Sequence, residues 1–191
     1  SSRLFLNPMY LRPEAVPEYA LLGQHDRDTI KELREQLNEE QAGEQLLDRD
    51  ASWTNKREAL RIIFGAGLRP ARQMAFDDFK RRRGRRLRDF ALWCVLCEHY
   101  GNDWRQWDED LQRPTSPRVA KLHNDYLDEI TFNEWLQWVS WNQLSDAQQA
   151  AQDAGMPVGI VTDLAVGVSG ASADTWMMSD IYAQDISVGA P

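Results

Sequence analysis

The residue with the clearest chemical implication is Asp163, which interrupts an apolar and largely β-branched run over residues 158–168. That run follows a helical pattern stopped by Gly155 and Pro157, and a helix, a turn and then a buried strand is typical of a parallel sheet. An ionised carboxylate is costly to bury unless it is paired. In a parallel α/β architecture, such a residue near the C-terminal end of a strand faces the active site. Asp163 is therefore the first candidate site residue, and a structural ion pair is the alternative.

Cys94 and Cys97 form a C-x-x-C pair. A redox pair of this kind lies at a helix N-terminus, where the helix dipole lowers the pKa of the thiol. Here the pair lies near the C-terminal end of a predicted apolar helix, which favours packing in the core. Two cysteines so close together cannot staple a domain of this size, which favours a reducing compartment and hence the cytoplasm.

Metal and cofactor chemistry is weakly indicated. The histidines at positions 25, 99 and 123 are scattered, and the sequence has no H-E-x-x-H motif, P-loop or G-x-G-x-x-G. His123 falls on an apolar helical face, which predicts a satisfied residue at the core or its rim. We therefore expect neither a metal site nor a cofactor.

A run of basic residues over positions 80–88 could in principle contact nucleic acid. The whole chain, however, has 22 Lys and Arg against 30 Asp and Glu, a net charge of −8, which opposes the positive footprint that such binding needs. Phe79, Leu87 and Phe90 of the same predicted helix point inward. The arginines are accordingly predicted to lie on a solvated face or in ion pairs, without a nucleic-acid partner.

The 191 residues, 42% hydrophobic and 27% charged, are typical of one soluble domain or slightly more. The longest apolar run covers residues 90–97, far short of the roughly 20 residues that span a bilayer. No signal peptide is visible at the start, so no membrane partner is expected. Both ends look cut, and we expect a segment of a larger protein.

Helical periodicity dominates the chain. Three prolines make residues 1–22 a packed, extended loop, and helices are predicted over residues 28–49, 53–64 and 72–100, the last weakened at Gly84 and ended by Gly101. Ser116 and Pro117 open another helix as N-cap and first residue, and a capping box at Thr131 opens the next. The fold class is mainly α with a minor β component, the strand within residues 158–168. The predicted buried set is Phe76, Phe79, Phe90, Trp93, Trp135, Leu136 and Val139.

Several sequence blocks occur in an order that resembles one family. They are SSRLFLNPMY (1–10), RDFALW with EHYGNDWRQW (88–93 and 98–107), FNEWLQW (132–138), DLAVGV (163–168) and SVGAP (187–191). Together they resemble the amylomaltases, the 4-α-glucanotransferases of the bacterial maltose system. The resemblance spans nearly the whole chain.

The resemblance implies a (β/α)8 TIM barrel with extra helical subdomains, of which this chain would be an internal segment. Residues 1–22 would be an extended barrel loop, residues 23–156 a helical insertion and a barrel helix, and residues 157–191 a barrel strand with the following active-site loop.

The implied activity is retaining transfer of α-1,4-glucan units, such as maltooligosaccharides, to another sugar in starch, glycogen or maltodextrin metabolism. The family's catalytic carboxylates lie on later strands, so no catalytic residue is assigned here and the segment alone is expected to be inactive. Asp163 matches an aspartate at a strand end that helps to organise a sugar subsite. Trp176, in the following loop, is a second candidate for contact with glucan.

A non-catalytic helical module that binds carbohydrate or protein is the alternative, with an aromatic surface made by Trp104, Trp107, Trp135, Trp138 and Trp141. Their helical spacing is equally typical of core packing. The two interpretations differ in exposure, because a sugar platform needs at least two indoles open to solvent.

Overall fold

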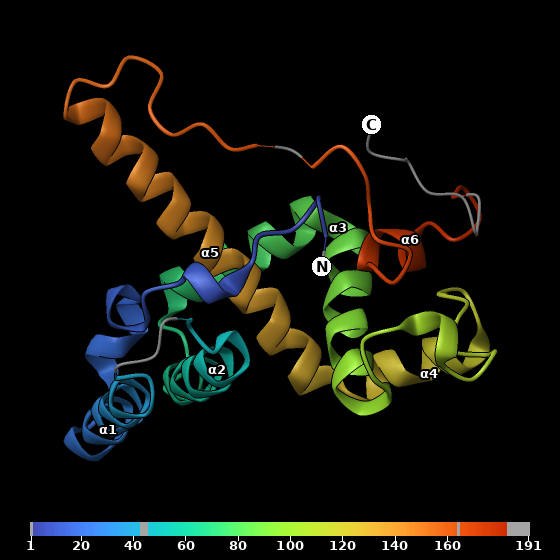
Figure 1. Ribbon diagram of the computed structural model, residues 1–191, viewed down its shortest axis with the longest axis horizontal. Coiled ribbons are helices and arrows are strands. Elements are labelled where there is room, and N and C mark those ends of the chain that lie inside the picture. The colour runs from blue at the N-terminus through green and yellow to red at the C-terminus, as the bar shows by residue number, and fades with distance from the viewer. Residues whose placement is uncertain (1, 43–45, 164, 183–191) are drawn as a thin grey trace. The chain divides into compact units, whose positions relative to one another are not determined.

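The computed structural model describes residues 2–42, 46–163 and 165–182, and over these ranges the protein is built from helices (Figure 1). The α-helices are α1 (Gln24–Glu40), α2 (Arg49–Gly65), α3 (Pro70–Tyr100), α4 (Pro117–Asp125), α5 (Leu127–Asp153) and α6 (Ala173–Met177). Short 3-10 turns are η1 (Pro8–Tyr10), η2 (Pro13–Ala15), η3 (Pro17–Leu21) and η4 (Trp104–Gln106). The mainly α class is confirmed.

The strand predicted within residues 158–168 is absent from the described part of that stretch, which excludes position 164. A strand exists only through hydrogen bonds to a neighbouring strand, and the described residues supply none. Side chains of Gln148 and Arg3 bond the backbone of this stretch instead. The predicted strand is therefore not seen in the described residues, because none of them pairs with this stretch as a second strand.

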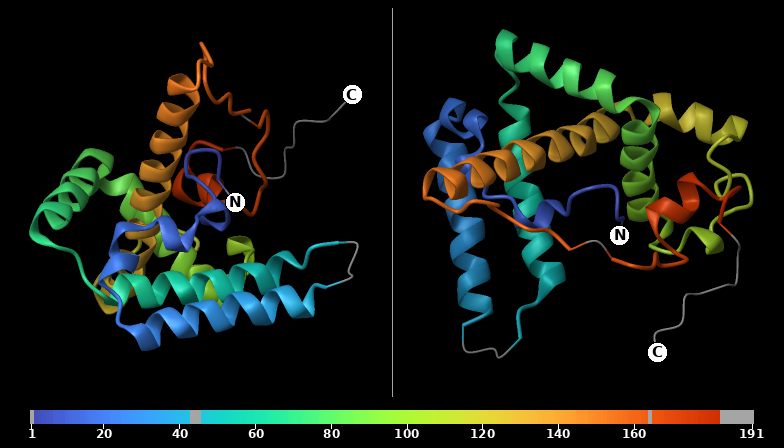
Figure 2. Two further views of the ribbon diagram at one scale, coloured as in Figure 1. Left: turned by 90° about the vertical axis from the view of Figure 1, so that its left-hand side faces the viewer. Right: turned by 90° about the horizontal axis from the view of Figure 1, so that it is seen from above.

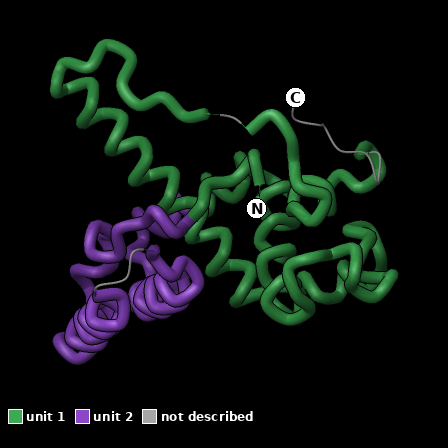
Figure 3. Tube along the Cα trace, viewed as in Figure 1, with its two compact units in different colours: residues 1–7, 77–191 green, residues 8–76 purple. Residues whose placement is uncertain are grey.

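The chain forms two compact units, residues 8–76 and residues 1–7 with 77–191 (Figure 3). In unit 2, residues 8–76, each of Pro8, Pro13 and Pro17 begins a 3-10 turn, because the fixed φ of proline suits the first position of a helical turn. α1 and α2 lie side by side and antiparallel (Figure 2).

A buried ion pair ties the proline-rich turns of this unit to the start of α3. Glu18 is 2% exposed and accepts two hydrogen bonds from Arg72, Nε to Oε1 at 2.6 Å and Nη2 to Oε2 at 2.8 Å. A bidentate guanidinium contact of this kind satisfies a carboxylate that burial would otherwise penalise.

The core of unit 1, residues 1–7 and 77–191, is an aromatic cluster. The second half of α3 contributes Phe90, Trp93 and their neighbours, and η4, α4, the start of α5 and α6 pack around them. Phe5 stacks on Phe90 with ring centroids 4.0 Å apart. The buried set predicted from periodicity is confirmed, with Phe76, Phe79, Phe90, Trp93, Trp135, Leu136 and Val139 all buried.

Predicted helix ends agree with the structure where local chemistry decides them. Ser116 caps α4 by accepting a hydrogen bond from the Val119 amide, and Gly101, with φ of 91°, follows the end of α3. The start at Thr131 is wrong. α5 already begins at Leu127, and the Thr131 hydroxyl donates back to the Leu127 carbonyl at 2.7 Å, a bond open to a threonine inside a helix.

Gly84 divides α3 at a bend (Figure 2), with φ of 62° and ψ of −149°. Only glycine adopts this conformation without strain, so Gly84→Ala is expected to lower the free energy of unfolding by about 1–3 kcal/mol. A Cβ there would meet no atom within 4 Å, so the loss would come from the backbone alone. Urea unfolding measures it.

Gly65→Ala, at the end of α2, is the matched control, since its Cβ also meets open space and its φ is not positive. We expect that variant to be neutral or slightly stabilising. A gain in stability from Gly84→Ala would contradict the prediction, because it would mean that α3 straightens without cost.

Candidate functional site

Asp163 lies exposed on the irregular stretch that follows α5. Before it in the chain, Gln148 of α5 accepts a hydrogen bond from the Ile160 amide at 2.7 Å and donates to the Val158 carbonyl at 3.1 Å. After it, the Arg3 guanidinium donates to the carbonyls of Ala165 and Val166 at 3.0 and 2.8 Å. The carboxylate is thus presented between two anchored points.

Arg3 is itself fixed by Asp174, a carboxylate in the first turn of α6 that is only 1% exposed. The Arg3 amide donates to Asp174 Oδ2 at 2.7 Å, and the Ser2 hydroxyl donates to Oδ1 at 2.5 Å. These two bonds offset the cost of burying the charge. The start of the chain is therefore joined to α6 and, through Arg3, to the stretch that carries Asp163.

Gln137 of α5 makes a second link to the start of the chain. Its amide accepts from Leu6 N at 3.0 Å and donates to Leu6 O at 2.8 Å, as a paired strand would. Sequence reasoning missed Arg3, Gln137, Gln148 and Asp174. The partners of Arg3, Gln137 and Asp174 lie far away in the sequence, and no local pattern distinguishes any of the four residues from ordinary surface polar residues.

Trp176, the second candidate from the sequence, lies in the core of its unit with 0% exposure. Its Nε1 donates to the Leu111 carbonyl at 2.8 Å, and its ring meets Trp107 edge-on at 6.1 Å. In this structure the indole offers no face to a sugar. Contact between Trp176 and glucan stays a prediction.

The five tryptophans considered as an aromatic sugar-binding surface are not sufficiently exposed for that role. Trp104, Trp107, Trp135 and Trp138 are at most 4% exposed, and Trp141 is half-buried with the Arg83 guanidinium 4.3 Å above its ring. Fewer than two of these five indoles are open to solvent, so core packing explains them.

Cys94 and Cys97 are partly buried and pack against the aromatic cluster, as the core-packing interpretation expects. Burial raises the pKa of the Cys97 thiol from its ordinary value of 9.0 to about 12. Because the thiolate is the reactive form, alkylation of Cys97 by iodoacetamide near pH 8 is expected to be at least about tenfold slower than that of an exposed cysteine, since the smaller thiolate fraction outweighs the greater nucleophilicity of a thiolate of high pKa.

Peptide mass spectrometry after timed alkylation measures this rate, and alkylation in urea supplies the unfolded control. Rapid modification of Cys97 in the native protein would contradict the buried thiol.

The basic run of α3 lies on an exposed face and several of its members are paired, as predicted. Asp78 bonds Arg81 and, at 2.9 Å, Arg82, while Arg85 Nε lies 3.1 Å from Asp89 Oδ2. Asp78 and Asp89 therefore neutralise part of the positive charge of this run.

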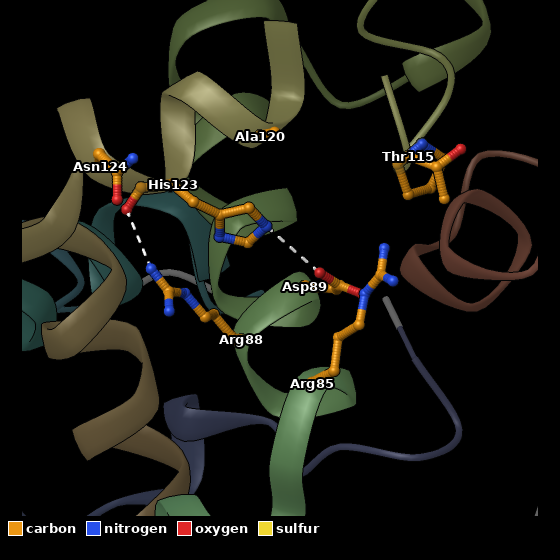
Figure 4. Close-up of a pocket in the computed structure, with 8 residues that line it drawn as sticks. Arg85, Arg88, Asp89, Thr115, Ala120, His123 and Asn124 are labelled. Atoms are coloured by element: carbon orange, nitrogen blue, oxygen red, sulfur yellow. Dashed lines mark hydrogen bonds and ion pairs between the residues drawn. The ribbon is translucent and has the colours of Figure 1, made fainter. Parts of the chain in front are cut away.

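A pocket of about 460 Å³ lies beside the end of this run, between α3 and α4 (Figure 4). At its base, His123 Nε2 lies 3.3 Å from Asp89 Oδ1, which agrees with the expectation of a satisfied histidine on that side of the ring. Its Nδ1 is buried and has no hydrogen-bond partner. The lining residues are Arg85, Arg88, Asp89, Pro114, Thr115, Ala120, His123 and Asn124.

Among the described residues, no group of three or more His, Cys, Asp or Glu side chains is placed to hold a metal ion. In the same part of the chain, no helix combines the length and apolar character needed to cross a membrane.

Comparison with known proteins identifies the class. Residues 1–191 match the model of the 4-alpha-glucanotransferase family of glycoside hydrolases, so the chain belongs to this family. The resemblance found in the sequence is thereby confirmed.

Individual relatives of the chain have the same name as the family. The chain is 42% identical to a 4-alpha-glucanotransferase of Mycobacterium tuberculosis over 193 residues, which cover 100% of this chain and 26% of the relative. It is 29% identical to that of Haemophilus influenzae, covering 100% of this chain and 30% of the relative. A relative from Oryza sativa subsp. japonica is 28% identical over 97% of this chain. The chain thus spans about a quarter of the length of the first of these relatives.

Proposed function

We propose that the protein to which this chain belongs transfers α-1,4-glucan units, such as maltooligosaccharides, to another sugar by a retaining mechanism. The observation that carries the proposal is the family match over all of residues 1–191 together with 42% identity to a relative of that name. Its metabolic setting would be the turnover of starch, glycogen or maltodextrin. Its proposed location is a reducing cytoplasm, because two cysteines only three positions apart cannot cross-link a domain of this size.

The role proposed for this chain is structural support of the sugar site, without the reacting carboxylates. Retaining transfer needs two carboxyl groups roughly 5 Å apart, one as nucleophile and one as acid. Of the four buried carboxylates among the described residues, Glu18, Asp89 and Asp174 are each engaged by an arginine, a histidine or the start of the chain. Burial raises the pKa of the fourth, Glu134. Asp163 remains as an exposed group that can accept hydrogen bonds from sugar hydroxyls.

Residues 157–168 are proposed to form one strand of a (β/α)8 barrel beside strands from elsewhere in the complete protein. Their apolar side chains support this, since Val158, Val161 and Val166 are 71%, 76% and 85% exposed. A barrel core would bury such side chains. Asp163 would then lie at the strand's C-terminal mouth, where α/β barrels hold their active sites.

Incubation with maltotriose tests the activity. The complete enzyme is expected to produce glucose and longer glucans with retained α linkages, which chromatography and anomeric proton resonances distinguish. The 191-residue chain alone is expected to produce neither. Transfer by the isolated chain would contradict the support role, and hydrolysis without longer products from the complete enzyme would contradict transferase function.

A further inference from the structure

The pocket between α3 and α4 is separate from the stretch that carries Asp163, and the proposed function does not use it. It lies within one compact unit, since its lining residues all belong to residues 77–191. α3 supplies Arg85, Arg88 and Asp89, and the opposite wall comes from the loop before α4 and from α4 itself.

The charges of this pocket are arranged so that its only carboxylate is already engaged. Asp89, 8% exposed, bonds His123 through Oδ1 at 3.3 Å and Arg85 through Oδ2 at 3.1 Å. Two guanidinium groups therefore face one satisfied carboxylate. The lining is positive although the whole chain has a net charge of −8. The positive charge of the pocket is therefore a local feature and does not reflect the overall composition.

The two arginines are placed to act together. They are three positions apart on α3, which puts them on the same helix face, and Figure 4 shows their side chains flanking the His123–Asp89 pair. The Arg85 side chain is 68% exposed. Arg88 is also exposed and uses one donor on the His123 carbonyl at 3.4 Å. A guanidinium carries five N–H donors in a planar fork that matches phosphate oxygens.

Polar uncharged groups complete the wall opposite the arginines. Thr115 offers a hydroxyl and Asn124 an amide, while Pro114 and Ala120 are apolar. A volume of about 460 Å³ falls within the range of sites for small molecules.

We propose that this pocket binds a small phosphomonoester, with Arg85 and Arg88 holding the phosphate and Thr115 and Asn124 contacting what the phosphate carries. Arg85 is in an ion pair with Asp89, and the charge of Arg88 also acts on the buried Glu134, so we assign the phosphate to both guanidinium groups together. Asp89, which also bonds His123, positions Arg85 through their ion pair.

Titration calorimetry of the complete enzyme at constant ionic strength tests the proposal, with inorganic phosphate, glucose 1-phosphate and uncharged glucose as probes. Phosphate and glucose 1-phosphate are expected to bind saturably, and glucose is not. Tighter binding of glucose 1-phosphate than of phosphate supports recognition of a phosphorylated sugar by the opposite wall. Equal binding would overturn the roles given to Thr115 and Asn124, because the site would then recognise the phosphate group alone.

Two arginines of α3, one that lines the pocket and one that does not, are substituted to test the site. Arg88→Gln is expected to weaken phosphate binding by about tenfold or more, the effect of losing charge-assisted hydrogen bonds, and Arg88→Lys should restore part of it. Arg86→Gln is the matched control, because Arg86 is exposed on α3 and does not line the pocket. It should bind the probes within about twofold of the wild type, and circular dichroism should show all three variants folded.

Absence of saturable binding in the wild type would overturn the proposal. So would equal losses from Arg86→Gln and Arg88→Gln, since those would assign the affinity to the general charge of α3. An oligonucleotide that bound more tightly than glucose 1-phosphate, with equal dependence on Arg82, Arg86 and Arg88, would overturn it by assigning anion recognition to the whole basic run.

Discussion

Asp163→Asn in the complete enzyme is expected to lower kcat/KM for maltooligosaccharide transfer by about tenfold to a thousandfold, the range for losing one preorganised polar group in a site. Asparagine keeps the shape of the side chain and removes its charge. Because Asp163 is exposed and its stretch is held through backbone groups by Gln148 and Arg3, the fold should hardly change. Initial rates over a range of maltotriose concentrations measure the effect.

Asp146→Asn supplies the control for this experiment. Asp146 is an exposed carboxylate on α5, so its neutralisation changes the net charge equally and should leave kcat/KM within about twofold, as for most surface substitutions. Near-normal transfer by Asp163→Asn would favour the structural ion pair that the sequence left open as an alternative.

Trp176→Ala is expected to lower the free energy of unfolding of this chain by about 3–5 kcal/mol, the usual cost of truncating a buried aromatic residue to alanine. Two losses contribute. The cluster around Trp107 would lose the contacts of a fully buried indole, and the Leu111 carbonyl would lose the Nε1 donor at 2.8 Å. Urea unfolding followed by far-ultraviolet circular dichroism measures the change.

Two further variants separate packing from hydrogen bonding and from sugar contact. Trp176→Phe keeps most of the apolar volume and removes the donor, so it should cost less than Trp176→Ala. Trp141→Ala removes a half-buried indole that faces Arg83 and should also cost less. If Trp176→Ala left stability unchanged but greatly weakened glucan binding in the complete enzyme, the residue would be a sugar contact after all.

The sequence determined the features that local chemistry controls. Ser116 and Pro117 start α4, because a hydroxyl cap and a fixed φ act within one helical turn. Gly84 and Gly101 adopt positive φ, which only glycine does at little cost. Helical periodicity likewise identified the buried aromatic residues, since the side that faces the core repeats along each helix.

The same local logic failed where neighbours from elsewhere in the chain decide the outcome. The capping-box pattern at Thr131 fits a helix start, yet the helix continues upstream, where the Ile130 amide bonds the Tyr126 carbonyl at 2.9 Å. The run over residues 158–168 has the composition of a strand, but a ladder needs a second strand, which the described residues do not supply.

The candidate site shows this division most clearly. Asp163 was visible in the sequence as a charge inside an apolar run. The groups that hold its surroundings were not, because Asp174 meets Ser2 across 172 positions and Gln137 meets Leu6 across 131. The His123–Asp89 pair joins two helices in the same way. Hydrogen bonds and ion pairs between distant residues depend on where folding brings the backbone, so only the tertiary structure decided them.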